Sequence, residues 1–116
     1  MPTSKDFTIH QGTTFRQPLV WKTGSSLTPV DLTGATARLQ VRSKVASEDV
    51  LLSLSTEDTG IVLGGSAGTI DLFLSDTDTS ALTWEYGVYD LEIVRASGDV
   101  VRLLQGVFTV SKEVTR

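Results

Sequence analysis

The strongest constraint on the fold is a two-residue alternation of apolar and polar side chains. The clearest case is ATARLQVRS, residues 35–43, where alanine, leucine and valine alternate with threonine, glutamine and arginine. Successive side chains of a strand point to opposite faces, so this segment predicts a strand with one face on a core and one in water. The pattern recurs less regularly at residues 15–21, 50–54, 70–74, 89–93 and 100–110.

Segments rich in turn-forming residues separate the predicted strands: KTGSS, DLTG, STEDTG and ASGD, beginning at residues 22, 31, 55 and 96. The segment SDTDTSAL predicts a single helical turn capped by Ser75 or Asp76. No long segment repeats its apolar residues every 3.6 positions, as an amphipathic helix would. Roughly six to eight short strands joined by regular turns predict an all-β sandwich or a small barrel.

The last predicted strand changes phase along its length. Val101 and Leu103 point inward at its start, whereas Phe108 and Val110 point inward at its end. Such a change requires one extra residue, and Gly106 is the predicted position of the resulting β-bulge.

Composition limits the architecture and the classes of partner. The 116 residues fit one domain, 1–116, with a short N-terminal arm and a C-terminal tail, SKEVTR. The absence of cysteine excludes disulfides and thiolate metal sites. A net charge of −4 argues against a nucleic-acid partner. No apolar stretch is long enough to cross a membrane, so we expect no membrane partner either.

The segment GIVLGGSAGTI, residues 60–70, is the one that most resembles a nucleotide site. Gly60 and Gly65 have the spacing of a phosphate-binding loop, but Ser66 stands where that loop has lysine and Ala67 where it has a hydroxyl. A strand pattern follows in place of the helix that a dinucleotide fold requires. The segment therefore predicts two strands joined by a glycine turn.

Other candidate sites are incomplete. Asp76, Asp78 and Ser80 have the spacing of the first calcium ligands of an EF-hand, but Ala81 and Gly87 occupy the positions of its required glycine and glutamate. His10 is the only histidine and has no recognisable catalytic or zinc-binding neighbours in the sequence. We therefore predict no catalytic, cofactor-binding or metal-binding residues, no cofactor, and no small-molecule substrate.

Charged residues also follow the strand period. Asp90 and Glu92 share the outward face of one predicted strand, and Arg38 and Arg42 share that of another. If these strands are neighbours, the four residues form a cross-strand ladder of opposite charges.

A partner interface is predicted from apolar residues that fall on outward positions. They are Phe73, Val88, Val94 and Leu51, and the face carrying Phe73 and Val88 is expected to contact a neighbouring subunit. Several such residues on adjacent strands would form a patch that a partner covers.

Several stretches together resemble a known family: FTIHQGTTFRQPLVW, VDLTGATARLQVRS, LLSLSTEDTGIVLGGSAGTIDLFLS, GVYDLEIV and DVVRLLQGVFTVSKEVTR. In this order they resemble small structural proteins of tailed bacteriophages, including the immunoglobulin-like N-terminal domain of phage baseplate upper proteins. The most telling pieces are the entry from Ile9 to Phe15 and the turn from Val30 to Gly34. The resemblance implies an immunoglobulin-like antiparallel β-sandwich of about seven to eight short strands.

The resemblance also implies a non-enzymatic virion protein, made in the bacterial host cytoplasm and placed on the tail or the capsid surface. It is expected to be a tail, baseplate or tail-fibre adaptor that binds other phage virion proteins and copies of itself. One alternative is a capsid decoration protein that clamps shell subunits. An alternative of another class is a carbohydrate-binding module, for which Trp84, Tyr86 and Trp21 are the available aromatics.

Overall fold

The structure is a computed structural model that describes residues 3–114. Its larger sheet has the strand order β1-β11-β10-β6-β7, and β2 also pairs with β11. The strands of this sheet are β1 (Thr3–Ser4), β2 (Phe7–His10), β6 (Thr36–Arg42), β7 (Leu52–Ser55), β10 (Tyr86–Val94) and β11 (Val100–Ser111). The smaller sheet has the order β3-β9-β8, formed by β3 (Phe15–Val20), β8 (Ile61–Leu63) and β9 (Thr69–Leu74).

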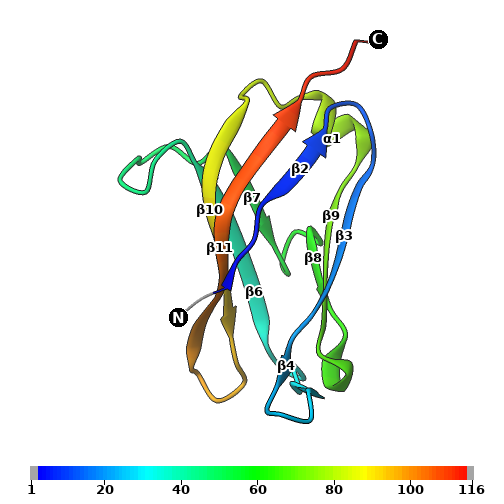
Figure 1. The fold of residues 1–116 in the computed structure, drawn as a ribbon, viewed down its shortest axis with the longest axis vertical. Helices are drawn as coiled ribbons and strands as arrows, with labels where there is room; N and C mark the ends of the chain where they lie inside the picture. The colour runs from blue at the N-terminus through cyan, green and yellow to red at the C-terminus, as the bar shows by residue number, and fades with distance from the viewer. Residues whose placement is uncertain (1–2, 115–116) are drawn as a thin grey trace.

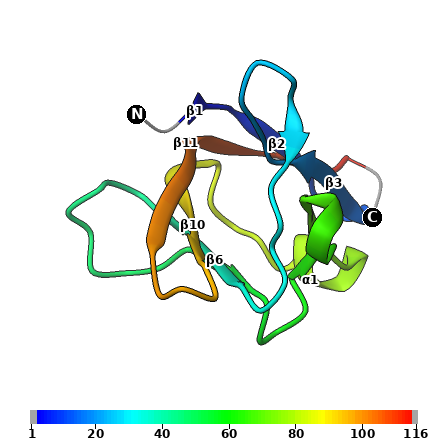
Figure 2. The same cartoon turned by 90° about the horizontal axis from the view of Figure 1, so that it is seen from below.

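The two sheets form two layers, as seen in Figures 1 and 2. A two-stranded hairpin, β4 (Lys22–Thr23) and β5 (Thr28–Pro29), lies at one end, and the single α-helical turn α1 (Asp76–Ser80) lies at the other. A short 3₁₀ turn, η1 (Gly65–Ala67), joins β8 to β9. The prediction of an all-β sandwich is confirmed.

The core lies between the sheets and receives one face of each strand. In β6, Ala37, Leu39 and Val41 are at most 2% exposed, while Arg38 and Gln40 face solvent. The alternation in β9 and β10 is also as predicted, with buried residues Ile70, Leu72, Leu74, Tyr89, Leu91 and Ile93. Because a one-residue slip would expose all of these side chains, the buried face determines the register of the strands.

Four aromatic rings form the centre of one half of the core. Phe108 is fully buried, and its ring lies 4.9 Å from that of Tyr89, 5.2 Å from that of Phe7 and 6.1 Å from that of Phe15. The tilted and edge-on arrangements are those that aromatic pairs prefer. This cluster joins β2, β3, β10 and β11, and so connects the two layers.

The N-terminal residues, expected to form a short arm, belong to the larger sheet from Thr3 onward. β1 and β2 pair in parallel with β11, and the main chain passes close to Gly106 between them. A side chain at position 106 would collide with the carbonyl of Lys5, so glycine permits this approach. The start of the expected C-terminal tail is hydrogen-bonded to the rest of the domain. Lys112 Nζ donates to Thr83 O, and Glu113 N donates to Gln11 Oε1.

Two details of strand phase correct the sequence analysis. The phase change in β11 is confirmed, but the extra residue is Leu103, because Leu91 pairs with Leu104 and Glu92 with Arg102. In the segment before β7, Val50 is 40% exposed, whereas Leu51 packs against the core. Residues 43–51 form a loop between β6 and β7 (Figure 1). The alternation of buried and exposed side chains in β7 therefore does not continue into the residues before it.

Candidate functional site

The glycine-rich segment is a turn, as predicted. β8 and β9 pair antiparallel on either side of η1, with Leu63 opposite Ile70. Gly65 and Gly68 have φ of 63° and 70°, in the left-handed region that favours glycine. A side chain at Gly68 would also lie 2.8 Å from the carbonyl of Trp21. The glycines therefore serve the turn and its packing.

The acidic segment before β10 is the predicted capped turn. The Ser75 hydroxyl accepts a hydrogen bond of 3.1 Å from Asp78 N, which caps α1. The buried Thr79 hydroxyl donates to Thr13 O and accepts from Gly12 N, which joins α1 to the β2–β3 loop. Within residues 3–114, no group of three or more histidine, cysteine or acidic side chains could hold a metal ion.

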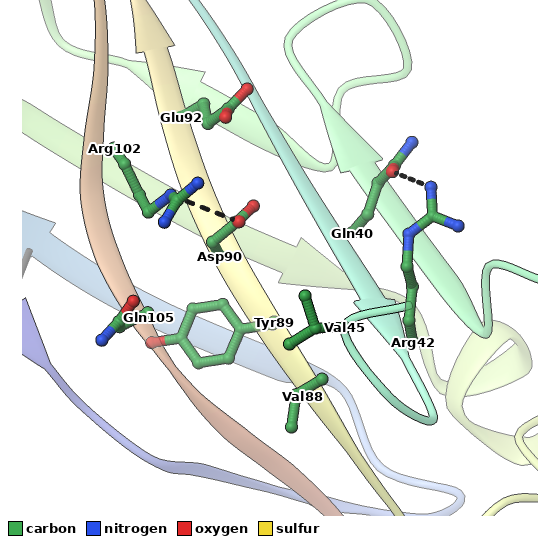
Figure 3. A pocket seen from close by; sticks show the side chains of 9 residues that line it. All are labelled: Gln40, Arg42, Val45, Val88, Tyr89, Asp90, Glu92, Arg102 and Gln105. Atoms are coloured by element: carbon green, nitrogen blue, oxygen red, sulfur yellow. Dashed lines mark hydrogen bonds and ion pairs between the residues drawn. The ribbon is translucent and has the colours of Figure 1, made fainter. Parts of the chain in front are cut away.

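The predicted charge ladder exists in part on the outer face of the larger sheet, where Figure 3 shows Arg42, Glu92 and the Asp90–Arg102 ion pair. Arg38 Nε lies 2.9 Å from Glu92 Oε1, across the β6–β10 pair as expected. Asp90 pairs instead with Arg102 of β11, at 3.5 Å. Arg42 donates to the carbonyls of Ser47 and Glu48, so it holds the 43–51 loop.

A shallow pocket lies on this charged face. It is lined by Val88 and by Val45 of the 43–51 loop, together with side chains of the ladder (Figure 3). Val45 is 89% exposed and Val88 is half-buried. The remaining lining residues are Gln40, Arg42, Tyr89, Asp90, Glu92, Arg102 and Gln105. The charged side chains that line this pocket already have partners within the chain, since Asp90 and Glu92 are ion-paired with arginines and Arg42 donates to main-chain carbonyls.

The outer face of the smaller sheet has a different character. A groove of about 580 Å³ is lined by Arg16, Gln17, Pro18, Thr59, Val62, Asp71, Leu72 and Phe73. Phe73 is half-buried, and the guanidinium of Arg16 lies 4.9 Å from the centroid of its ring. Val62 is 54% exposed, and Pro18 and Asp71 are opposite each other on β3 and β9. We call this surface the Phe73 face.

The structure does not bring the four predicted interface residues onto one face. Phe73 belongs to the smaller sheet, whereas Val88 and Val94 belong to β10 of the larger sheet, so their outward side chains point away from opposite sides of the sandwich. Leu51 is half-buried, packs against the core and lies beside Gly87. The expectation of a single face carrying Phe73 and Val88 was wrong, because α1 carries the chain from one layer to the other.

The open edge of β3 is protected against strand addition. Among the strands of residues 3–114, β3 pairs only with β9, and near its centre is Pro18, which has no N–H to donate. The Gln17 side chain donates to the Pro18 carbonyl at 3.2 Å. Proline on an edge strand is a common defence against edge-to-edge association. We therefore look to the faces of the sandwich rather than to this edge for a partner site.

The aromatic residues considered for sugar binding do not form one platform. Trp84 and Tyr86 lie at the start of β10, whereas Trp21 lies near Arg95, just beyond its end. Trp84 packs against the core, and Tyr86 is 58% exposed. A row of stacked sugars would need exposed rings close together, so these three residues do not make such a row.

Sequence reasoning missed Arg16 and Val62 as parts of the Phe73 face. The available signal was the alternation in β3, where Arg16, Pro18 and Val20 are exposed between less exposed neighbours. The proximity of Arg16 to Phe73 depends on β3 pairing with β9, a contact between segments far apart in the chain, whereas Val62 is brought near by the local β8–β9 pair. Alternation identifies the outward face of a strand but not its neighbour.

Comparisons with known proteins define the fold. No protein-family description matches the sequence. No curated protein matches it either. Over 98% of this chain, the structure is similar to the extracellular domain of the voltage-gated sodium channel β4 subunit, with a TM-score of 0.50, 12% identity and 96% coverage of that chain.

Extracellular domains 3–5 of Drosophila OTK give a TM-score of 0.37 and 15% identity over 90% of this chain, which spans 32% of that structure. At 12% identity, the likeness to the sodium channel domain concerns the fold alone. The chain is an immunoglobulin-like β-sandwich.

Proposed function

We propose that the protein is a non-enzymatic structural component of a tailed-phage virion, acting through protein–protein contacts as a tail, baseplate or tail-fibre adaptor. The observation that supports contact as its mode of action is the Phe73 face, where exposed Pro18 and Val62 lie on either side of Asp71 and the half-buried Phe73 is two residues further along β9. Exposed apolar surface of this kind is typical of sites that a protein partner covers.

The virion setting rests on the sequence resemblance, which covers nearly the whole chain. Known sandwiches of this fold also act by contact: the sodium channel β4 extracellular domain forms a parallel homodimer with a role in cell–cell adhesion. That precedent concerns the type of interaction, since a fold hosts many functions. Manufacture in a bacterial cytoplasm and a place in the particle follow as parts of the proposal.

The test is the amount of this protein in purified virus particles from cells that carry its gene, measured with isotope-labelled peptides. A tail or baseplate adaptor should be present in about six or twelve copies per particle, in keeping with closed rotational symmetry. Hundreds of copies would support the alternative, a capsid decoration protein. Absence from the particles would contradict both.

A further inference from the structure

We propose that a second copy of this chain binds the Phe73 face in a two-fold symmetric contact that pairs Arg16 of each copy with Asp71 of the other. The inference rests on the proposed role in protein assembly and specifies its face and its partner. Three observations support it: opposite charges without an ion-pair partner, apolar Phe73 and Pro18 beside them, and the absence of net charge on the groove.

The first observation is that Arg16 and Asp71 are not neutralised within the described chain. Among residues 3–114, the salt bridges are Arg38–Glu92 and Arg102–Asp90, both on the larger sheet. Arg16 and Asp71 are exposed, and the guanidinium of Arg16 lies over the Phe73 ring. On the larger sheet, Arg38, Asp90, Glu92 and Arg102 are thus paired with opposite charges and Arg42 is bound to main-chain carbonyls, whereas Arg16 and Asp71 have no ion-pair partner among the described residues.

The second observation is their position relative to the apolar residues. Arg16 is opposite Phe73, and Pro18 is opposite Asp71, on adjacent antiparallel strands. Arg16 and Asp71 thus occupy diagonal corners of a four-residue unit whose other corners are Phe73 and Pro18. A second copy can be turned by 180° about an axis that lies in the plane of this face and is perpendicular to the Arg16–Asp71 diagonal. This rotation places Arg16 of each copy over Asp71 of the other. It also brings the two Phe73 rings near each other.

The third observation is the charge of the groove itself. The chain has a net charge of −4, which opposes contact between copies at most places on the surface. The groove residues include one arginine and one aspartate, and no other charged side chain. Two copies can therefore approach through this face without net repulsion, and the reciprocal pairing is what an isologous contact requires.

The contact is expected to be weak in isolation, since the face has only three short strands. Specific interfaces cover about 800 Å² on each partner, and those at the small end are transient. We therefore expect a dissociation constant in the micromolar range. Many copies held in one particle would strengthen the contact through high effective concentration.

The experiment is analytical ultracentrifugation of the full chain between about 10 and 500 μM, a range that covers weak dimers. Wild type should show dimerisation that depends on concentration. Arg16→Glu and Asp71→Arg, each alone, should weaken dimerisation roughly tenfold or more, because each creates two like-charge contacts. An equimolar mixture of the two variants should associate again, since both cross-pairs then have opposite charges.

The matched controls are two single variants that each reverse one charge of the Arg102–Asp90 pair on the larger sheet. Arg102→Glu and Asp90→Arg should dimerise as wild type does, and thermal unfolding of all variants checks that they are folded. A wild type that stays monomeric at the highest concentration would overturn the inference, as would a mixture that fails to associate. Neither result bears on the presence of the protein in virus particles, so the proposed function is tested separately.

Discussion

The phenol of Tyr89 donates a hydrogen bond of 2.7 Å to the main-chain carbonyl of Lys5, 84 residues away in the chain. Tyr89 is buried in β10, and Lys5 lies between β1 and β2. Nearby, Lys5 N donates to Gln105 O, and Val107 N donates to the carboxylate of Asp6. These contacts attach the N-terminal strands to the larger sheet beside Gly106.

Tyr89→Phe should therefore destabilise the protein by about 1 kcal/mol, because the Lys5 carbonyl loses its partner while the ring stays packed. Urea unfolding monitored by circular dichroism measures the change. Hydrogen exchange should also increase at the amide of Lys5 more than in β6. An unchanged free energy of unfolding would show that the hydrogen bond contributes nothing.

The same residue predicts a loss of stability at alkaline pH. Burial, with a smaller contribution from the charge of Asp6, raises the pKa of Tyr89 well above its ordinary value of 10. Above about pH 10 the unfolded chain releases this proton while the folded chain retains it, so the free energy of unfolding falls as pH rises. The difference in stability between wild type and Tyr89→Phe should thus be smaller near pH 11 than near pH 8. A difference independent of pH would contradict this.

Gly68→Ala should be more destabilising than Gly24→Ala. The two glycines have similar φ, 70° and 77°, so the backbone strain of the substitution is matched. A methyl group at position 68 would lie 2.8 Å from the Trp21 carbonyl, whereas one at position 24 would have no atom of residues 3–114 within 4 Å apart from those of its own chain neighbours. We expect losses of about 2 kcal/mol or more and about 1 kcal/mol respectively. Equal losses in thermal unfolding would disprove the role of close packing.

Phe108→Ala should remove a large part of the stability, about 3–5 kcal/mol, because the fully buried ring contacts three other aromatic rings. Val100→Ala, at a side chain that is 55% exposed in the same strand, is the control and should change stability by less than about 0.5 kcal/mol. Chemical unfolding of both variants gives the comparison. Similar effects at the two positions would mean that the aromatic cluster is not the centre of the core.

The Arg38–Glu92 pair should contribute little, about 0.5 kcal/mol or less, since the Arg38 side chain is 58% exposed. A double-mutant cycle with Arg38→Gln and Glu92→Gln measures the coupling, and salt near 1 M should remove most of it. A coupling above 1.5 kcal/mol that survives high salt would indicate a pair that is better shielded than its exposure suggests.

Local patterns predicted most of the elements. Ala37, Leu39 and Val41 alternate with polar residues in the sequence and lie on the buried face of β6. The Ser75 cap and the glycine turn before β9 were also predictable, because capping and left-handed backbone conformations depend on a few neighbouring residues.

Contacts between distant segments were not predictable in this way. Phe73 and Val88 both occupy outward positions, but their separation onto different sheets depends on the path of the chain through α1. The exact position of the bulge in β11, at Leu103, depends on how that strand is matched to β10.

By itself, the sequence determined that the chain forms short strands around one core and which side of most strands is buried, since these follow from side-chain period and turn chemistry. Only the tertiary structure decided which strands are neighbours. It thereby placed Arg16 over Phe73 with Asp71 at the opposite corner, and joined Tyr89 to Lys5. The physical reason is that strand pairing is a long-range choice, made by the closing of the whole core rather than by any one segment.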